Sequence, residues 1–189
     1  MEVNKPTELI LSRLRPYWLK HDCIAWDAAS WSTGYAAWRK GLFYEGVIQV
    51  PDKKASPLER VAYMYHEARK VMRELFPHQG ISVFLEMGVA NSISNGLLLG
   101  AVRGALIGAC ETCDTFQEIS NSSWKTSLGV RSRDSASQKR DAWTILCSWH
   151  GYEIDQTWCE TKKEFTFDRS DAMGILTHAI TTIDYKEEE

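Results

Sequence analysis

Residues 22–50, DCIAWDAASWSTGYAAWRKGLFYEGVIQV, decide the fold of this chain. This stretch holds three apolar, β-favouring segments separated by turn residues: predicted strands over 22–29, 35–38 and 42–50, with turns at Ser30 to Gly34 and Lys40-Gly41. Pro51 ends the third strand, because proline has no N–H to offer a sheet. Three consecutive strands with short connections predict an antiparallel meander.

Helices and strands alternate after the meander. Ser56-Pro57-Leu58-Glu59 predicts a helix start, with Ser56 as N-cap and proline in the first turn, and the helix reaches Leu75. The later predicted elements are a strand at Ile81 to Glu86, a helix from Ser92, a strand at Thr115 to Ile119, a helix at Ser137 to Trp149 and a last helix from near Asp168. The pattern predicts an α/β domain over residues 22–189, with a mixed five-stranded sheet of meander plus parallel strands flanked by helices. Residues 1–21 predict an N-terminal helical extension.

Composition restricts the class of protein. The 189 residues carry a net charge of −3 and 44% hydrophobic residues, which is typical of one globular domain. No apolar run reaches the length of a membrane span, and the N-terminus lacks the apolar core of a signal peptide. Five scattered cysteines favour reduced thiols and an intracellular, cytoplasmic location. Cys110 and Cys113 have the spacing of half a zinc site, but nothing in the sequence completes it, so a structural role is favoured.

Four carboxylates stand out against this background. Asp27 lies in an otherwise apolar strand, and Glu86 ends another. Burying an isolated carboxylate costs several kcal/mol, so such acids must be paired, hydrogen-bonded or bound to metal. Asp168 and Asp171 are three residues apart where a helix begins, so they share one helix face. Since the first and fourth strands are natural neighbours in a mixed sheet, we expect all four acids to meet.

These acids predict a site for a hard cation. Taken singly, each has a simple structural reading as a strand-end acid, a hydrogen-bonded core acid or a helix cap. Together they offer only oxygen ligands, without histidine or cysteine, which suits Mg²⁺ or Mn²⁺ rather than zinc. Two such ions about 4 Å apart form a clamp used in phosphodiester hydrolysis.

A basic segment follows the predicted fifth strand. Residues 124–140 contain five basic side chains against one acid: Lys125, Arg131, Arg133, Lys139 and Arg140 against Asp134. Such a cluster neutralises phosphates without reading sequence. Its alternative is a solvated charged loop.

At this point the chain resembles the RuvC-type Holliday junction resolvases of the RNase H-like superfamily, including phage members. The resemblance rests on IAWDAAS at 24–30 with TGY at 33–35, on VFLE at 83–86, on LGAVRG at 99–104, and on DRSDA at 168–172. It covers roughly residues 22–184. Bacterial members carry an aromatic residue three positions after the strand-end glutamate, to stack on an opened base. That position is Val89 here, and Met87 is a candidate replacement.

The resemblance implies a Mg²⁺-dependent endonuclease that resolves four-way DNA junctions by paired symmetric nicks in a bacterial or phage-infected cell. It implies Asp27, Glu86, Asp168 and Asp171 as catalytic ligands of two Mg²⁺ ions, with Mn²⁺ able to substitute. It also implies that Lys125, and one or both of Lys139 and Arg140, contact the junction backbone. A homodimer is expected, with the glycine-lined helix from residue 92 to 112 as a candidate contact.

Other readings stay open. The same acids suit a nuclease with another preference, such as flaps, forks or RNA–DNA hybrids, and a non-catalytic junction-binding protein is a further alternative. Residues 27–34 also resemble the phosphate loop of sugar kinases and actin-like ATPases, but 189 residues are too few for the two lobes those proteins need. His178 lies seven residues after Asp171, about 10 Å along the helix, which favours a packing or surface role.

Overall fold

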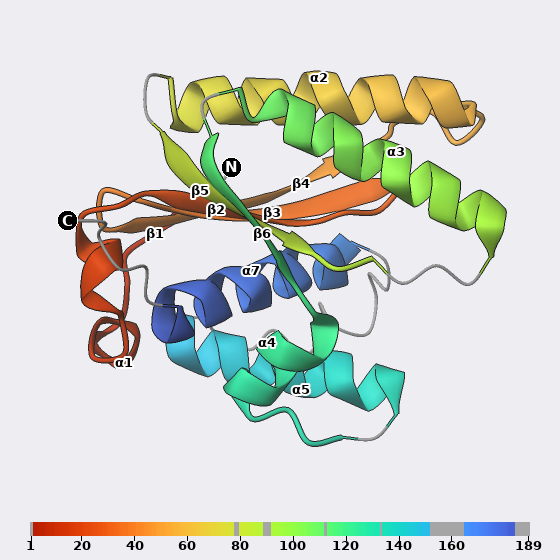
Figure 1. The fold of residues 1–189 in the computed structure, drawn as a ribbon. Coiled ribbons are helices and arrows are strands. Elements are labelled where there is room, and N and C mark those ends of the chain that lie inside the picture. Colours follow the sequence, from red (N-terminus) through yellow and green to blue (C-terminus); the bar gives the residue numbers. More distant parts are fainter. Residues whose placement is uncertain are drawn as a thin grey trace.

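The structure is a computed structural model in which a twisted sheet lies between two layers of helices (Figure 1). It describes residues 2–77, 80–88, 92–111, 113–132, 134–151 and 165–183. The strands are β1 (Glu2–Asn4), β2 (Cys23–Asp27), β3 (Ser32–Arg39), β4 (Leu42–Gln49), β5 (Ile81–Glu86) and β6 (Cys113–Ile119). Their spatial order is β1-β4-β3-β2-β5-β6. The pairs β2–β5 and β5–β6 are parallel and the others are antiparallel. The predicted fold class, a meander extended by parallel strands, is confirmed.

The meander differs from the prediction at its first turn. β3 begins at Ser32, so Thr33 and Gly34 belong to the strand rather than to the predicted turn. Gly34 pairs with Asp27 in the antiparallel register, which places the glycine beside the acid at the end of β2. The turn prediction was too long because serine and glycine are ordinary turn formers, whereas here they occupy strand positions under a helix.

The N-terminal segment contributes more than the predicted helix. β1 adds a sixth, short strand at the edge of the sheet by pairing with β4. A one-turn helix α1 (Glu8–Leu11) and a 3₁₀ helix (Pro16–Leu19) follow it. Trp18 is fully buried in the core of the domain, so this extension packs tightly on the fold.

One face of the sheet is covered by α2 (Pro57–Leu75) and α3 (Ile93–Ala109). The predicted start of α2 is confirmed, with a full capping box between Ser56 and Glu59. The core on this face comes from alternate strand residues and from one side of each helix, including Ile24, Trp26, Val83, Leu85, Met64 and Leu106. Strand alternation leaves the neighbouring residues for the opposite face.

The opposite face is covered by α7 (Phe165–Thr182), with α4 (Asn121–Leu128) and α5 (Ser135–His150) packed beneath it (Figure 1). The core here includes Cys23, Ala25, Phe84, Trp124, Leu176 and Ile180. α7 begins three residues before Asp168, so the two aspartates lie in its first two turns rather than at its cap. Over the ranges that the structure describes, every helix is too short or too polar to span a bilayer.

Candidate active site

Strand alternation brings Asp27 and Glu86 to the same face of the sheet. Ala25 on β2 and Phe84 on β5 belong to the core under α7, and the acids follow two residues later on each strand. β2 and β5 run parallel in adjacent positions, with Trp26 opposite Leu85, so their final acids lie side by side. The expected neighbourhood of the first and fourth predicted strands is confirmed.

α7 crosses this end of the sheet at very close range. A Cβ atom on Gly34 would collide with the main-chain carbonyl of Asp168, so only glycine allows the helix to lie this low. The Ser32 hydroxyl, also on β3, donates a hydrogen bond to the Asp168 carboxylate. Asp171 lies one turn further along α7 and is buried, with 7% of its surface exposed. The close approach of α7 therefore places both of its acids over the ends of β2 and β5.

The four acids interact electrostatically. Burial raises the pKa of Asp27 well above its ordinary value, and the charges of Asp171, Glu86 and Asp168 together with a hydrogen bond to Glu86 raise it further. Burial, and then the charge of Glu86, raises the pKa of Asp171 to about 7. The structure thus brings together all four acids named from the sequence, in a setting that disfavours the negative charge of Asp27 and Asp171.

Two side chains from α4 hold Glu86. Asn121 donates from Nδ2 to Glu86 Oε1 at 2.8 Å, and the Trp124 indole donates to the same oxygen at 3.2 Å. Neither residue is named from the sequence, because no helix is predicted over 121–128 and residues 124–140 are treated as a basic segment. The signals of this helix were Ser120, whose hydroxyl accepts from the Ser123 amide, and Gly129, which takes the left-handed conformation after the helix.

The carboxylates suit a divalent cation in their chemistry. Asp171 Oδ1 is buried and has no hydrogen-bond partner among the described residues, so a buried acceptor is left for a ligand. All the candidate ligands are hard oxygen donors. As the side chains stand, the described ranges contain no group of three or more potential ligands close enough together to hold an ion. The acids therefore fit a divalent cation by donor type and unmet charge.

Two residues of the basic segment lie close to the acid cluster. The charges of Lys139 on α5 and Lys125 on α4 lower the pKa of Asp171, so both lie close to the acids. Arg131 and Arg140, from the same segment, are exposed to solvent. Arg133 lies outside the described residues, as does Val89.

The surroundings of His178 and of the Cys110–Cys113 pair favour structural roles for these residues. Burial lowers the pKa of His178, whose Nδ1 is 2.8 Å from the Ser127 hydroxyl on α4. Burial raises the pKa of the Cys110 thiol to about 12 and that of Cys113 to about 11, which opposes the thiolate form that zinc needs.

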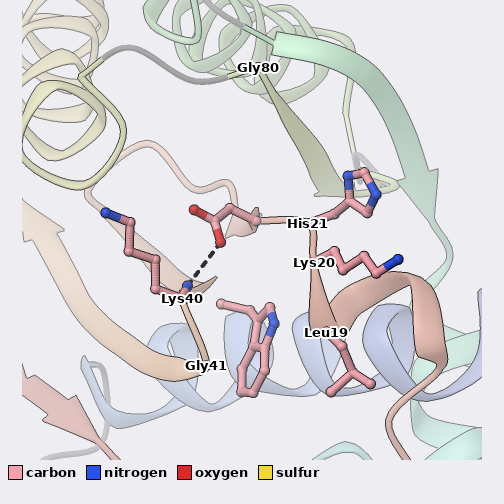
Figure 2. A pocket seen from close by; sticks show the side chains of 8 residues that line it. Leu19, Lys20, His21, Lys40, Gly41 and Gly80 are labelled. Carbon is pink, nitrogen blue, oxygen red and sulfur yellow. Dashed lines mark hydrogen bonds between the residues drawn. The ribbon is translucent and has the colours of Figure 1, made fainter.

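A separate cavity of about 540 Å³ lies at the other end of the strands (Figure 2). Lys20, His21 and Lys40 line it, and the carboxylate of Asp22 accepts a 2.9 Å hydrogen bond from the Lys40 amide. Asp22 precedes β2, whereas Asp27 ends that strand, which separates them by roughly 16 Å. This cavity is therefore remote from the acid cluster.

Several solved structures have a fold similar to that of this chain. RuvC of Thermus thermophilus in complex with a Holliday junction substrate superposes with a TM-score of 0.62 and 15% identity, covering 85% of this chain and 93% of that one. A second Thermus thermophilus RuvC structure gives a TM-score of 0.60 and 16% identity, covering 84% and 93%. The fold is the RNase H-like fold of RuvC.

A structure from yeast also matches. The yeast mitochondrial Holliday junction resolvase Ydc2 gives a TM-score of 0.54 and 11% identity, covering 93% of this chain and 86% of that one. No protein-family model matches the sequence, and a search of curated proteins finds no match either. The predicted resemblance to RuvC is thus confirmed in the fold.

Proposed function

We propose that this chain is a Mg²⁺-dependent, structure-selective endonuclease that resolves four-way DNA junctions by paired symmetric nicks. Residues 22–189 form its nuclease domain, with residues 1–21 as an N-terminal extension, and it works in the reducing interior of the cell. The observation that carries the proposal is the convergence of Asp27, Glu86, Asp168 and Asp171 where β2 and β5 end beneath α7. A cluster of mutually repelling carboxylates, two of them buried and two partly buried, is typical of a functional site.

Each residue has a role in this proposal. The four acids hold the cations, and Mn²⁺ substitutes for Mg²⁺. Bound Mg²⁺ supplies activation of the attacking water and stabilisation of the leaving 3′ oxygen. Asn121 and Trp124 orient the Glu86 carboxylate through their two hydrogen bonds. Lys125 and Lys139 bind phosphates of the strand at the site, while Arg131, Arg133 and Arg140 add contacts to the DNA backbone.

A second copy of the chain completes the enzyme in this proposal. The outer face of α3 carries Ile93, Leu97 and Ile107, which are 86%, 73% and 44% exposed. Added Cβ atoms on Gly100 and Gly104 would meet nothing within 4 Å, so this face does not pack on the sheet. An apolar helix face with small residues suits close packing against its own copy, and a two-fold dimer suits symmetric incisions.

The activity is tested with purified protein and end-labelled DNA. Four-way junctions, flaps, forks, RNA–DNA hybrids and linear duplex are each incubated with and without Mg²⁺. We expect paired symmetric nicks in the four-way junction alone, abolished in Asp27→Asn and Asp171→Asn while junction binding persists. Asp52→Asn, which changes an exposed acid of the β4–α2 loop, is the matched control and retains cleavage.

Three results would change the assignment. Full activity in either site variant removes the proposed catalytic acids, and cutting of flaps, forks or hybrids in preference to junctions replaces the substrate. The dimer is tested separately by sedimentation of Leu97→Glu, with Leu58→Glu as control because Leu58 is 78% exposed on α2. A wild-type protein that sediments only as a monomer removes the dimer.

A further inference from the structure

An exposed aromatic side chain and an arginine lie beside the acid cluster, and the proposed hydrolysis uses neither. Trp31 is the last residue of the loop between β2 and β3, and 43% of its surface is exposed. Asp27 ends β2 before this loop, and Ser32, which donates to the Asp168 carboxylate, begins β3 after it. The loop therefore connects one of the four acids to the residue that holds another.

Hydrogen bonds fix the main chain of this loop. The carbonyl of Trp31 accepts a 2.9 Å hydrogen bond from the amide of Val50, which follows β4. The hydroxyl of Thr33 donates a 3.0 Å hydrogen bond to the carbonyl of Ala29 and so closes the loop on itself. The exposed ring of Trp31 is thus held at a defined place at the end of the sheet.

Arg60, near the start of α2, packs on this ring. Its guanidinium carbon lies 4.3 Å from the centre of the Trp31 ring, and its Nη1 donates a 3.3 Å hydrogen bond to the Ser30 hydroxyl. Arginine stacks on an aromatic face in this way while the edge of its guanidinium can still bind an anion. α2 and α7 begin at the same end of the sheet, one on each face (Figure 1), so Arg60 lies at the end that carries the acids.

No acid neutralises Arg60 within the part of the chain that the structure describes. The adjacent acid, Glu59, belongs to the helix cap, where it accepts a 2.7 Å hydrogen bond from the Ser56 amide. The Nη2 group of Arg60 has no hydrogen-bond partner among the described residues and is not fully buried. An oriented guanidinium with an accessible N–H edge and no anion of its own suits a phosphate.

The strand register gives the separation between this arginine and the acids. Gly34 on β3 lies opposite Asp27, and Trp31 comes three residues before Gly34. At 3.3–3.4 Å per residue, Trp31 lies roughly 10 Å beyond Asp27 along the strand direction. One strand of B-form DNA carries a phosphate about every 3.4 Å of helix axis, so this separation corresponds to about three nucleotides.

Cations then lie on both sides of the acids. β2, which carries Asp27, lies between β3 and β5 in the sheet. On the β5 side, α4 holds Glu86 and carries Lys125, and α5 carries Lys139. Arg60 lies on the β3 side. A DNA strand with one phosphate at the acids therefore meets positive charge in both directions along its backbone.

We propose that Arg60, held on Trp31, binds a backbone phosphate of the cleaved strand about three nucleotides from the phosphate at the acids. The strand crosses the end of the sheet from the lysines of α4 and α5 to the start of α2. Arg60 is a DNA-binding residue, and Trp31 is a positioning residue that fixes its guanidinium. The inference rests on the proposed function, because it takes the acids as the site of the reacting phosphate.

The contact is tested by junction binding without cleavage, in the Asp171→Asn background and over a range of salt concentrations. We expect Arg60→Gln to weaken binding by about tenfold and to reduce the slope of log K against log salt concentration by about 1, because one phosphate contact is lost. Arg73→Gln removes the same charge from an exposed position in the last turn of α2 and leaves both values unchanged. An arginine that only braced the loop would leave the salt slope unchanged on substitution.

The contacted phosphate is located with junctions in which one phosphate at a time is replaced by an uncharged methylphosphonate. We expect binding to weaken by about tenfold at one position, about two to four nucleotides from the site of cleavage. Arg60→Gln protein binds that junction and the unmodified junction equally well, whereas Arg73→Gln protein still distinguishes them. Trp31→Leu shows part of the loss, and adds none when combined with Arg60→Gln.

Failure of this inference is distinguishable from failure of the proposed function. If wild-type protein cleaves junctions in Mg²⁺ but Arg60→Gln keeps its affinity and salt slope, the contact is wrong and the nuclease stands. An equal loss in Arg73→Gln also overturns the contact, since net charge alone would then explain the effect. Insensitivity to methylphosphonate at every position within about five nucleotides of the cleavage site overturns it without any change to Arg60. If no junction is bound or cleaved, both proposals fall.

Discussion

Two regions of the interface between α7 and the sheet bury carboxylates, and their surroundings differ. Glu45 on β4 is 2% exposed and lies 3.8 Å from the guanidinium of Arg169 on α7, while Asn4 donates a hydrogen bond to its other oxygen. Asp171, one half-turn further along α7, is 7% exposed, and the charge of another acid, Glu86, raises its pKa. The first region neutralises its buried acid with a neighbouring cation.

The second region concentrates acids instead of neutralising them. The charges of Asp171, Glu86 and Asp168 all act on Asp27 and raise its pKa, and the charge of Glu86 raises that of Asp171. Lys139 and Lys125 partly offset the effect on Asp171. A single segment of α7 supplies both Arg169 for Glu45 and the acids of the site, so helix position alone does not explain the difference. A buried acid with a cation is a structural element, whereas a buried acid cluster without one is costly unless a ligand binds it.

The largest expected effect separates the two regions by activity. We expect Asp171→Asn to lower the rate of junction cleavage by about a hundredfold to a thousandfold. Removal of one charge-stabilising group from an active site typically costs roughly this much. Glu45→Gln keeps the shape of a comparably buried acid outside the cluster, so cleavage stays within severalfold of wild type. Single-turnover rates on a four-way junction measure both. Equal losses in the two variants would contradict a special role for the cluster.

Stability in the absence of metal should change in opposite directions in the same two variants. Asp171→Asn removes a repelled buried charge, so it raises the free energy of unfolding by on the order of 2 kcal/mol. Glu45→Gln leaves Arg169 without its anion, so it lowers the free energy of unfolding. Urea denaturation in EDTA measures both values, and a destabilised Asp171→Asn protein would show that the cluster carries no strain.

Breaking the neutralised pair from its other side gives the next largest effect. Arg169→Met leaves Glu45 buried without its cation, and we expect the free energy of unfolding to fall by about 3 kcal/mol. The double variant that adds Glu45→Leu removes both charges and recovers most of the loss, since a buried ion pair replaced by apolar residues is often close to neutral. Urea denaturation of wild type, Arg169→Met, Glu45→Leu and the double variant forms a double-mutant cycle, and additive losses would show that the two side chains do not interact.

His150 is a third buried titratable group, and the fold keeps its imidazole neutral. Burial lowers its pKa to about 4, and its Nε2 lies 2.9 Å from the Thr177 hydroxyl on α7. Between about pH 6.5 and pH 4 the unfolded chain binds a proton on this imidazole and the folded protein does not. The free energy of unfolding therefore falls as pH falls through this window, by about 3 kcal/mol in total.

Thermal or urea unfolding of wild type and His150→Gln across pH 4–7 isolates this contribution. The variant cannot titrate at this position, so the difference between the two curves should narrow as the pH falls. Parallel curves at all pH values would show that the imidazole does not govern the dependence.

Much of this site could be predicted because the acids violate the local pattern. Asp27 interrupts an apolar strand and Glu86 ends one, so each signals an unusual environment from the sequence alone. The alternation of strand residues then fixes the face on which both lie. The i, i+3 spacing of Asp168 and Asp171 likewise fixes their common direction on a helix.

The residues that support the site could not be found in this way. Ser32 and Gly34 look like turn formers, and their role under Asp168 depends on the height of α7 above the sheet, which is a tertiary property. Asn121 and Trp124 act through a helix of only eight residues, whose caps are its sole local signal. β1 pairs with β4 across some forty residues of sequence, and no local pattern encodes such a partner.

The smallest expected effect comes from removing a hydrogen bond that orients Glu86, without changing the charge of this residue. Asn121→Ala removes the 2.8 Å hydrogen bond to Glu86 Oε1 and leaves the one from Trp124. Loss of an orienting partner of a ligand typically costs 10–100-fold, and because Trp124 remains we expect a loss of about tenfold in cleavage. The loss should appear as a higher Mg²⁺ concentration for half-maximal rate, since a less ordered carboxylate binds a cation less well. Ser123→Ala, an exposed neighbour on the same helix, is the control, and a Mg²⁺ dependence unchanged in Asn121→Ala would show that Trp124 alone positions the acid.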